Sequence, residues 1–401
     1  MPDPAAPYAI KRLVVCFDGT WNTPEDQTNV SRMYAAVADV HARCPGQLKF
    51  YDPGVGTTTG TRLTGGALGL GLDDNILQAY AWLINELVSS GPTAPEGDGE
   101  GFDGGPDIFI FGFSRGAFTA RSLAGLVNRC GVLKRESFVG EKEPLTEKID
   151  DRAHPGSALV QQAWRLYQKT FPSGVEGRTQ PECVDFRRRY AWTVKVKCLG
   201  VWDTVGALGV PALSNSPLSR LRYGFHDTTL GRIVEHAYHA VAIDEQREDY
   251  QVTLWDALHP QGARDVEQRW FPGAHANVGG GYQDDLLPDR PLEWMAEKAL
   301  ALGLEFNDEF KQKLGEAACK ATLPEAFKLR GDEYLSPVRD SYAEFLHGVY
   351  GLTRALIFKG RYWRPMLTTG VCETIDETAH MKWAADSRYR PRNFANAGRR
   401  G

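Results

Sequence analysis

The sequence predicts an α/β fold with a mostly parallel central sheet and helices on both of its faces. Short apolar, β-branched runs alternate along the chain with segments whose apolar residues recur at helical spacing. Strands that are joined through helices pair in parallel, and a parallel sheet needs a helical layer on each face. With 401 residues, of which 42% are hydrophobic and 24% charged, the chain is long enough to bury such a core.

The alternation is most regular in the first third of the chain. Apolar runs such as RLVVCF and DIFIF predict buried strands, and the apolar residues between Ile76 and Leu87 fall on one helical face. The Gly/Thr-rich range 53–71 and the Gly/Pro-rich range 91–106 predict loops. The predicted elements are strands at Arg12–Phe17, Leu48–Tyr51 and Asp107–Phe111, and helices at Asn29–Ala42, Asp73–Val88 and Ala117–Val127.

The rest of the chain is less regular. Residues 134–160 are charged and irregular, and Gly206–Phe225, rich in Leu, Pro and Ser, predicts an insertion. The predicted elements are strands at Ala191–Trp202, Val252–Trp255 and Val266–Phe271, and helices at Arg232–Ile243 and Pro291–Leu302. We expect one enlarged core at residues 10–305, with an insertion at 206–230, and a C-terminal extension at 306–401 packed on that core.

Composition argues against several classes of function. A net charge of −5 provides no overall attraction to nucleic acid. The sequence has no run of 18 consecutive apolar residues, so no membrane span is predicted, and the N-terminus lacks the pattern of a signal peptide. The seven cysteines are dispersed without a CxxC pair, which argues against a disulfide framework or a zinc site and is typical of a reducing cytosol. No cofactor is expected. We expect a cytoplasmic location in the producing cell, and any export to need no signal peptide.

The strongest functional motif is Gly112-Phe113-Ser114-Arg115-Gly116. It follows an apolar strand directly and precedes a predicted helix. In a nucleophile elbow this setting places a serine on a sharp turn, and the flanking glycines relieve crowding so that Oγ projects above the sheet. The alternative is an ordinary tight turn with a helix-capping serine. We predict that Ser114 is a nucleophile.

A serine nucleophile needs a base and an orienting acid, which in this type of fold follow in the order Ser, Asp or Glu, His. Asp203 ends a predicted strand, and side chains at the carboxyl ends of parallel strands point into the ligand crevice. His275 also follows a strand and precedes three glycines. We predict Asp203 as acid and His275 as base. The alternatives are His236, His239 and His259 as bases, and Asp244 and Asp256 as acids.

The developing oxyanion needs backbone N–H donors. One is expected from Arg115, the residue after the nucleophile, and the other from the loop two strands before the elbow strand. That loop begins with Asp18, Gly19 and Thr20. We therefore expect that the sheet lacks the first two strands of the full hydrolase sheet, that Gly19 or Thr20 is the second donor, and that Asp18 fixes the loop.

Several blocks together resemble the α/β-hydrolase family related to type VI secretion phospholipase effectors. The resemblance implies a serine-hydrolase fold with Ser114, Asp203 and His275 as triad, and activity on phospholipid esters. The blocks are LVVCFDGTWN (13–22), TNV (28–30), YDPGVGT (51–57), GFSRGAFTARSLAG (112–125), LGVWDTVGALG (199–209), HAVAIDEQR (239–247), WFPGAHANVGGGY (270–282) and YRPRNF (389–394).

Apolar residues near the site are expected to contact the substrate, namely Trp21, Phe113, Trp202 and Leu208. The apolar range 208–225 is either a lid or acyl-binding wall, or a helical insertion packed on the core. A basic and aromatic tail is a candidate for contact with anionic lipid head groups, the alternative being a solvated face. Its residues are Lys359, Arg361, Tyr362, Trp363, Arg364 and Arg388–Arg392.

The sequence thus predicts a serine hydrolase that cleaves carboxylic esters through an acyl-enzyme, and the resemblance implies that the esters are those of lipids or phospholipids. Two alternatives remain. The first is a hydrolase fold that has lost catalysis and serves as a binding or scaffold protein. The second is an aspartate-based phosphatase, because Asp18-Gly19-Thr20 resembles part of a DxDGT motif; Cys16 stands where that motif has its nucleophilic aspartate.

Overall fold

The computed structural model describes most of the chain. Thr20, Trp21, Leu208, most of the predicted loop at 91–106 and most of the insertion lie outside the described residues. The described residues are 11–19, 22, 24–39, 46–54, 65–87, 105–138, 141–142, 149–150, 153–171, 176–206, 229–260, 262–282, 284–308, 319–344, 361–368 and 370–397.

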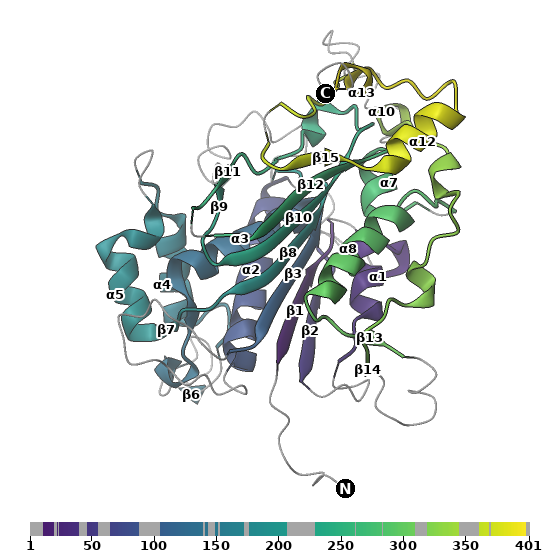
Figure 1. Ribbon diagram of the computed structural model, residues 1–401. Helices are drawn as coiled ribbons and strands as arrows, with labels where there is room; N and C mark the ends of the chain where they lie inside the picture. The colour runs from purple at the N-terminus through teal and green to yellow at the C-terminus, as the bar shows by residue number, and fades with distance from the viewer. Residues whose placement is uncertain are drawn as a thin grey trace, which may run out of the picture.

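The core of the protein is one sheet of seven strands in the order β15-β12-β10-β8-β3-β1-β2 (Figure 1). Every neighbouring pair in it is parallel. The strands are β1 (Arg12–Phe17), β2 (Gln47–Asp52), β3 (Asp107–Phe113), β8 (Val196–Trp202), β10 (Val234–Ala242), β12 (Asp265–Phe271) and β15 (Glu373–Ile375). Within the described residues no strand precedes β1. The predicted α/β fold with a parallel sheet is confirmed.

Helices cover both faces of the sheet, as the alternation of elements predicts (Figure 1). Leu13, Val15 and Phe17 of β1 pack in one apolar cluster with α2, α3 and α4, whereas Val14 and Cys16 pack in a second cluster with α1 and α8. The helices are α1 (Asn29–Ala36), α2 (Gly65–Leu87), α3 (Arg115–Cys130), α4 (Ala158–Gln168), α5 (Pro181–Tyr190), α7 (His275–Gly279), α8 (Asp289–Ala301), α10 (Ser341–Glu344), α12 (Glu377–Ala385) and α13 (Arg392–Ala397).

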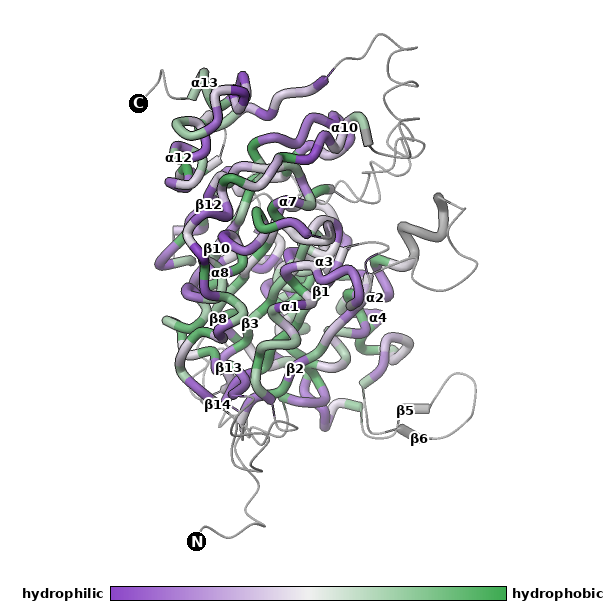
Figure 2. The backbone as a smooth tube through the Cα atoms, turned by 90° about the vertical axis from the view of Figure 1, so that its right-hand side faces the viewer, coloured by the Kyte–Doolittle hydropathy of each residue, from purple (hydrophilic) through white to green (hydrophobic). Residues whose placement is uncertain are grey.

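Short elements connect these layers. Figure 2 shows hydrophobic residues concentrated along the central strands, while the peripheral segments are more hydrophilic. The short strands pair as β4 (Val132–Leu133) with β7 (Ala191–Trp192), β5 (Glu141–Lys142) with β6 (Ile149–Asp150), β9 (Thr229–Leu230) with β11 (Ala257–Leu258), and β13 (Phe306–Asn307) with β14 (Cys319–Lys320). In the described part of the chain, no helix has the length and apolar character needed to cross a bilayer.

Several predicted elements differ from the structure. The predicted helix at Arg232–Ile243 is wrong, because these residues form β10 in the middle of the sheet. Helix α1 ends at Ala36, six residues earlier than expected, and α2 begins at Gly65 inside the expected loop. The expected long strand before Asp203 is interrupted between β7 and β8. Val252 forms only an isolated bridge with Val205 instead of a strand.

The C-terminal segment joins the main sheet. Strand β15 pairs in parallel with β12, which makes it the edge strand. Met366, Ala379 and Phe394 pack with Val241 of β10 and Trp270 of β12 in a third apolar cluster. Figure 1 shows α12, α13 and β15, in yellow, over the same end of the sheet as α7. The C-terminal segment therefore packs, through these side chains, close to the carboxyl ends of β10 and β12.

Candidate active site

Ser114 lies at the sharp turn between β3 and α3. Its φ of 57° is in the left-handed region that non-glycine residues rarely adopt. The turn is held by the Ser114 backbone N–H, which donates to Trp202 O at 3.0 Å, and by the Val205 N–H, which donates to Ser114 O at 3.3 Å. Backbone strain at such a turn is typical of functional sites. This is the local geometry that a nucleophile elbow requires.

The two glycines of the motif allow the backbones around Ser114 to approach closely. A Cβ on Gly112 would lie 2.4 Å from Gly116 O, and a Cβ on Gly116 would lie 2.3 Å from Phe17 O. Both distances are far below van der Waals contact. Only glycine therefore lets α3 start directly against the end of β1.

The side chain of His275 bridges Ser114 and Asp203. His275 is the first residue of the short helix α7, which follows β12 after a turn at Gly273. Its Nε2 lies 2.8 Å from Ser114 Oγ, and its Nδ1 lies 2.5 Å from Asp203 Oδ2. Three strand ends that are far apart in the sequence thus bring together the three residues expected from the motifs.

Asp203 is completely buried directly after β8 and also has a positive φ, of 40°. Its Oδ1 accepts the Ala242 backbone N–H at 2.9 Å and Arg364 Nη1 at 2.6 Å, while its Oδ2 accepts Arg364 Nη2 at 3.0 Å and faces His275. Burial by itself raises the pKa of this carboxyl, but the Arg364 guanidinium and His275 outweigh burial and hold the pKa below its ordinary value. Asp203 is therefore ionised at neutral pH.

Burial lowers the pKa of His275, and the Asp203 carboxylate opposes this effect. Two further charges act on the imidazole, Arg247 lowering the pKa and Glu245 raising it. Glu245 also accepts the His275 backbone N–H at 3.3 Å and forms a forked ion pair with Arg247, both contacts at 2.8 Å. The imidazole is thus neutral at pH 7 with an ionised partner on Nδ1. In this state Nε2 can accept the Ser114 proton.

Aromatic rings hold the imidazole between them. The Phe113 ring centroid is 4.7 Å from that of His275, and the Tyr250 ring stands nearly perpendicular at 5.1 Å. Gly279 allows this packing, because a Cβ there would lie 1.9 Å from the Phe113 ring. The ring of His275 is therefore fixed by packing as well as by hydrogen bonds.

Arg364 is the member of this cluster that sequence reasoning did not find. It is separated by 161 residues from Asp203 and lies in the tail that was expected to face solvent or lipid. Nothing in its local sequence distinguishes it from the neighbouring arginines. Only the structure distinguishes it, because there its side chain has no exposed surface and pairs with Asp203.

The loop after β1 is organised around the buried carboxyl of Asp18. This carboxyl accepts the Gly19 backbone N–H at 2.7 Å, Thr28 Oγ1 at 2.6 Å and the Tyr51 hydroxyl at 2.8 Å. Burial raises the pKa of Asp18 to about 6 in spite of these hydrogen bonds. The Gly19 N–H, one of the two expected oxyanion donors of this loop, is thus already engaged by Asp18.

The expected substrate-contacting residues have different positions. Trp202 has no exposed surface, and its indole N–H donates to Pro291 O at 3.3 Å, so it is a core residue instead of a wall of the site. Phe113 is 2% exposed because it packs on His275 and Gly279. Trp21 and Leu208 lie outside the described residues.

Three of the alternative bases and acids, His239, His259 and Asp244, are engaged elsewhere. His239 is buried in β10, where its Nε2 accepts the Thr204 N–H at 3.1 Å and burial lowers its pKa to about 3. His259 lies 3.5 Å from Glu176. Asp244 accepts the Gly273 N–H at 2.7 Å and the Tyr389 hydroxyl at 2.9 Å, and burial raises its pKa to about 6. None of these contacts includes Ser114 Oγ.

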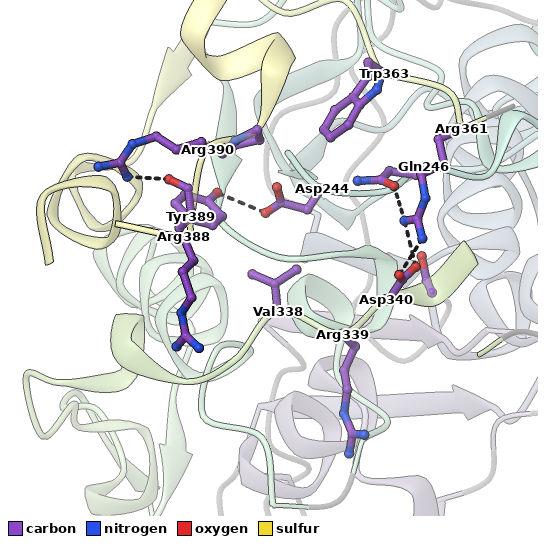
Figure 3. Close-up of a pocket in the computed structure, with 12 residues that line it drawn as sticks. Asp244, Gln246, Val338, Arg339, Asp340, Arg361, Trp363, Arg388, Tyr389 and Arg390 are labelled. Carbon is purple, nitrogen blue, oxygen red and sulfur yellow. Dashed lines mark hydrogen bonds and ion pairs between the residues drawn. The ribbon is translucent and has the colours of Figure 1, made fainter. Parts of the chain in front are cut away.

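A cavity of about 240 Å³ lies beside Asp244 and Gln246, between the loop at 338–341 and the tail (Figure 3). The arginines around it already have partners inside the protein. Arg361 pairs with Asp340 at 2.6 Å, and Arg390 donates to backbone carbonyls including Trp383 O at 2.8 Å. In the part of the chain that the structure describes, no cluster of three or more His, Cys, Asp or Glu side chains could hold a metal ion.

Comparison with solved structures gives the following similarities. An uncharacterized protein from Pseudomonas aeruginosa is 16% identical with a TM-score of 0.45, covering 81% of this chain and 50% of that one. The Tle1 effector bound to the VgrG spike of a type VI secretion system is 14% identical with a TM-score of 0.33, over 69% of this chain and 52% of that one. An esterase from Thermogutta terrifontis is 12% identical with a TM-score of 0.36, over 75% and 87%.

Sequence comparison identifies the family. The uncharacterized protein YEL023C of Saccharomyces cerevisiae is 28% identical over 260 residues, which are 59% of this chain and 31% of that protein, so the chain spans about a third of that relative's length. The family described as type VI secretion system phospholipase effector Tle1-like, catalytic domain, matches residues 11–298. This agrees with the resemblance in the motif blocks. Because the match covers most of the chain, the protein belongs to the family of Tle1-like phospholipase effector catalytic domains.

Proposed function

We propose that the protein is a serine hydrolase that cleaves carboxylic ester bonds through a Ser114–His275–Asp203 triad. The observation that supports this most directly is the imidazole of His275, with Nε2 at 2.8 Å from Ser114 Oγ and Nδ1 at 2.5 Å from Asp203 Oδ2. Nucleophile, base and orienting acid lie within hydrogen-bonding reach in the order that acyl transfer requires. Packing alone does not explain these contacts, because they require two buried ionisable side chains, Asp203 and His275.

The reaction proceeds in two halves. His275 Nε2 takes the Ser114 proton as Oγ attacks the ester carbonyl, and it then gives that proton to the departing alcohol. Water loses a proton to the same nitrogen, attacks the acyl-enzyme and releases the acid, and the proton returns to Ser114 Oγ. The ionised Asp203 stabilises the transient imidazolium and keeps the proton of neutral His275 on Nδ1.

The oxyanion that forms in each half needs donors. We assign one to the Arg115 backbone N–H, because Arg115 follows Ser114 and opens α3. The second comes from the loop that starts at Gly19. Because the Gly19 N–H already donates to Asp18 Oδ1, Thr20 is the better assignment of the two.

The proposed substrate class is a lipid or phospholipid ester. Its support is the description of the family, which names phospholipase effectors. The apolar range 208–225 follows the triad acid in sequence and fits an acyl-binding or lid role. Export by a type VI secretion system belongs to the same proposal and has the same support. The argument for contact between the basic tail and anionic membranes is weaker, because Arg361, Arg364 and Arg390 bind groups within the protein.

The experiment compares wild type with Ser114→Ala on p-nitrophenyl esters of increasing chain length and on phosphatidylcholine vesicles. A fluorophosphonate probe should label the wild type and leave Ser114→Ala unlabelled. We expect turnover to fall by about 10⁵–10⁶ in the variant. Retained esterase activity in a folded Ser114→Ala protein would contradict the triad. Absence of both labelling and turnover in the wild type favours a scaffold protein without catalysis.

A further inference from the structure

Arg364 makes a contact that family membership does not assign, since the family match ends at residue 298. Its two terminal nitrogens donate four hydrogen bonds, two of them to Asp203. The other two reach Ala242 O at 2.9 Å and Tyr250 O at 2.6 Å. The side chains of both Arg364 and Asp203 have no exposed surface. A fully buried, forked ion pair is therefore built onto the acid of the proposed triad.

The geometry points to Arg364 as a positioning residue for catalysis, acting through Asp203. This inference rests on the proposed triad and deepens it, because it adds a fourth member from the C-terminal segment. The guanidinium occupies one side of the carboxylate and leaves one edge of Oδ2 for His275 Nδ1. The planar fork of an arginine fixes the plane of a carboxylate in a way that a single ammonium cannot.

A stabilising role alone is a poor account of this pair. Burying two charges costs several kcal/mol per ion, and replacing a buried pair by apolar side chains is often neutral or stabilising. The pair is also attached at both ends to the site. Arg364 ties the ends of β8 and β10 together through Asp203 and Ala242, and Tyr250, whose carbonyl it binds, contacts the His275 ring at 5.1 Å. Asp203 and Tyr250 both contact the His275 imidazole, so Arg364 is attached to two groups that orient that ring.

The charge of Arg364 has a consequence for the protonation of the site. The charged or titratable groups around Asp203 and His275 include Arg364, Glu245, Arg247, His239 and Tyr250, whose ring packs on the imidazole. Removing the Arg364 cation makes the Asp203 carboxyl easier to protonate and stabilises the imidazolium of His275 against it. The acid limb of activity is set by protonation of His275, so the stronger stabilisation of its imidazolium by Asp203 moves that limb to higher pH.

The test measures the rate of Ser114 labelling by a fluorophosphonate probe as a function of pH. Arg364→Met should lower the maximal labelling rate about 100-fold, because misplacing a catalytic group by an ångström has an effect of that order. Its acid limb should also move upward. Arg364→Lys keeps the charge but loses the fork, so its acid limb should stay near that of the wild type while the maximal rate remains reduced.

Two controls make the result specific. Arg187→Met removes another buried arginine, on α5, whose Nη1 donates to Arg129 O and Arg178 O, and it should leave both rate and acid limb unchanged. Ser114→Ala separates the inference from the proposed function: labelling of Ser114→Ala refutes the triad itself. Labelling that depends on Ser114, together with an unchanged rate and acid limb in Arg364→Met, overturns only the role of Arg364.

If Arg364→Met does not fold, Arg364→Lys decides the question. Wild-type labelling by a folded Arg364→Lys protein then overturns the inference. A reduced maximal rate at an unchanged acid limb, with unaltered half-saturation by the probe, supports it, since a general loss of structure would not separate these quantities.

Discussion

Substitution of Gly116 by alanine should disable the elbow without removing any polar group of the site. An ideal Cβ at residue 116 would lie 2.3 Å from Phe17 O and 2.4 Å from Asp18 O. Both neighbours are backbone atoms, so no side chain can rotate away. The first turn of α3 and the end of β1 must therefore separate by about 1 Å to reach contact distance. Ser114, two residues earlier, moves with that turn.

The expected effects follow from this displacement. Overpacking of a rigid site costs about 1–3 kcal/mol of unfolding free energy. Ser114 Oγ is only 2.8 Å from His275 Nε2, so the shift should lower the rate about 100-fold. The assay combines urea denaturation with the rate of fluorophosphonate labelling and of p-nitrophenyl ester turnover. A variant with wild-type stability and rate would refute the close-packing argument.

A matched control lies in the same helix. At Gly125 the Cβ would be 3.0 Å from the edge of the Tyr167 ring, which is the far end of a side chain and can move by a few tenths of an ångström. Alanine also favours a helix over glycine by about 1 kcal/mol. Gly125→Ala should therefore keep the wild-type labelling rate, and its stability should differ by less than about 1 kcal/mol.

Three further outcomes are expected. Asp203→Asn should lower turnover about 10⁴-fold. It should also destabilise the fold by about 3–5 kcal/mol, because Arg364 loses its counter-charge. Activity near that of the wild type would contradict the assignment of Asp203 as the acid. The acid limb of the pH–rate profile should be centred below the ordinary imidazole pKa of about 6.5, because burial lowers the pKa of His275 and the neutral imidazole is the active form. An acid limb centred above that ordinary value would contradict this. Burial raises the pKa of Asp244 to about 6, so as the pH falls the folded state takes up this proton before the unfolded state does. The unfolding free energy of the wild type should therefore rise, relative to that of Asp244→Asn, by on the order of 3 kcal/mol between pH 7 and pH 4. Denaturation at several pH values measures this, and the same dependence of the unfolding free energy on pH in both proteins would refute it.

The order of elements around the site could be predicted because its signals are local. The strand DIFIF, the glycines 112 and 116 and the following helix lie within a few residues of each other, and the structure has them as expected. Asp203 and His275 could be placed because both follow strands, and the carboxyl ends of parallel strands meet at one edge of the sheet. Local sequence patterns therefore predict which residues meet in the site where each of those residues follows a strand of the same parallel sheet.

The misassigned β10 shows where such signals end. Ala237, Ala240 and Ala242 favour a helix, and His236 and His239 break the apolar run that a central strand normally shows. The strand forms because hydrogen bonds to β8 and β12 on its two sides outweigh this local preference. Propensity has little weight at a position buried on both faces.

The distance of Arg364 along the chain has a consequence for synthesis. A ribosome makes Ser114, Asp203 and His275 before it reaches Arg364, and β15 and its contacts come later still. Until the C-terminal segment has emerged, Asp203 belongs to a chain that lacks both its forked partner and the edge strand of the sheet. The ester-cleaving machinery proposed here would therefore become complete only after the segment that carries Arg364 and β15 has been made.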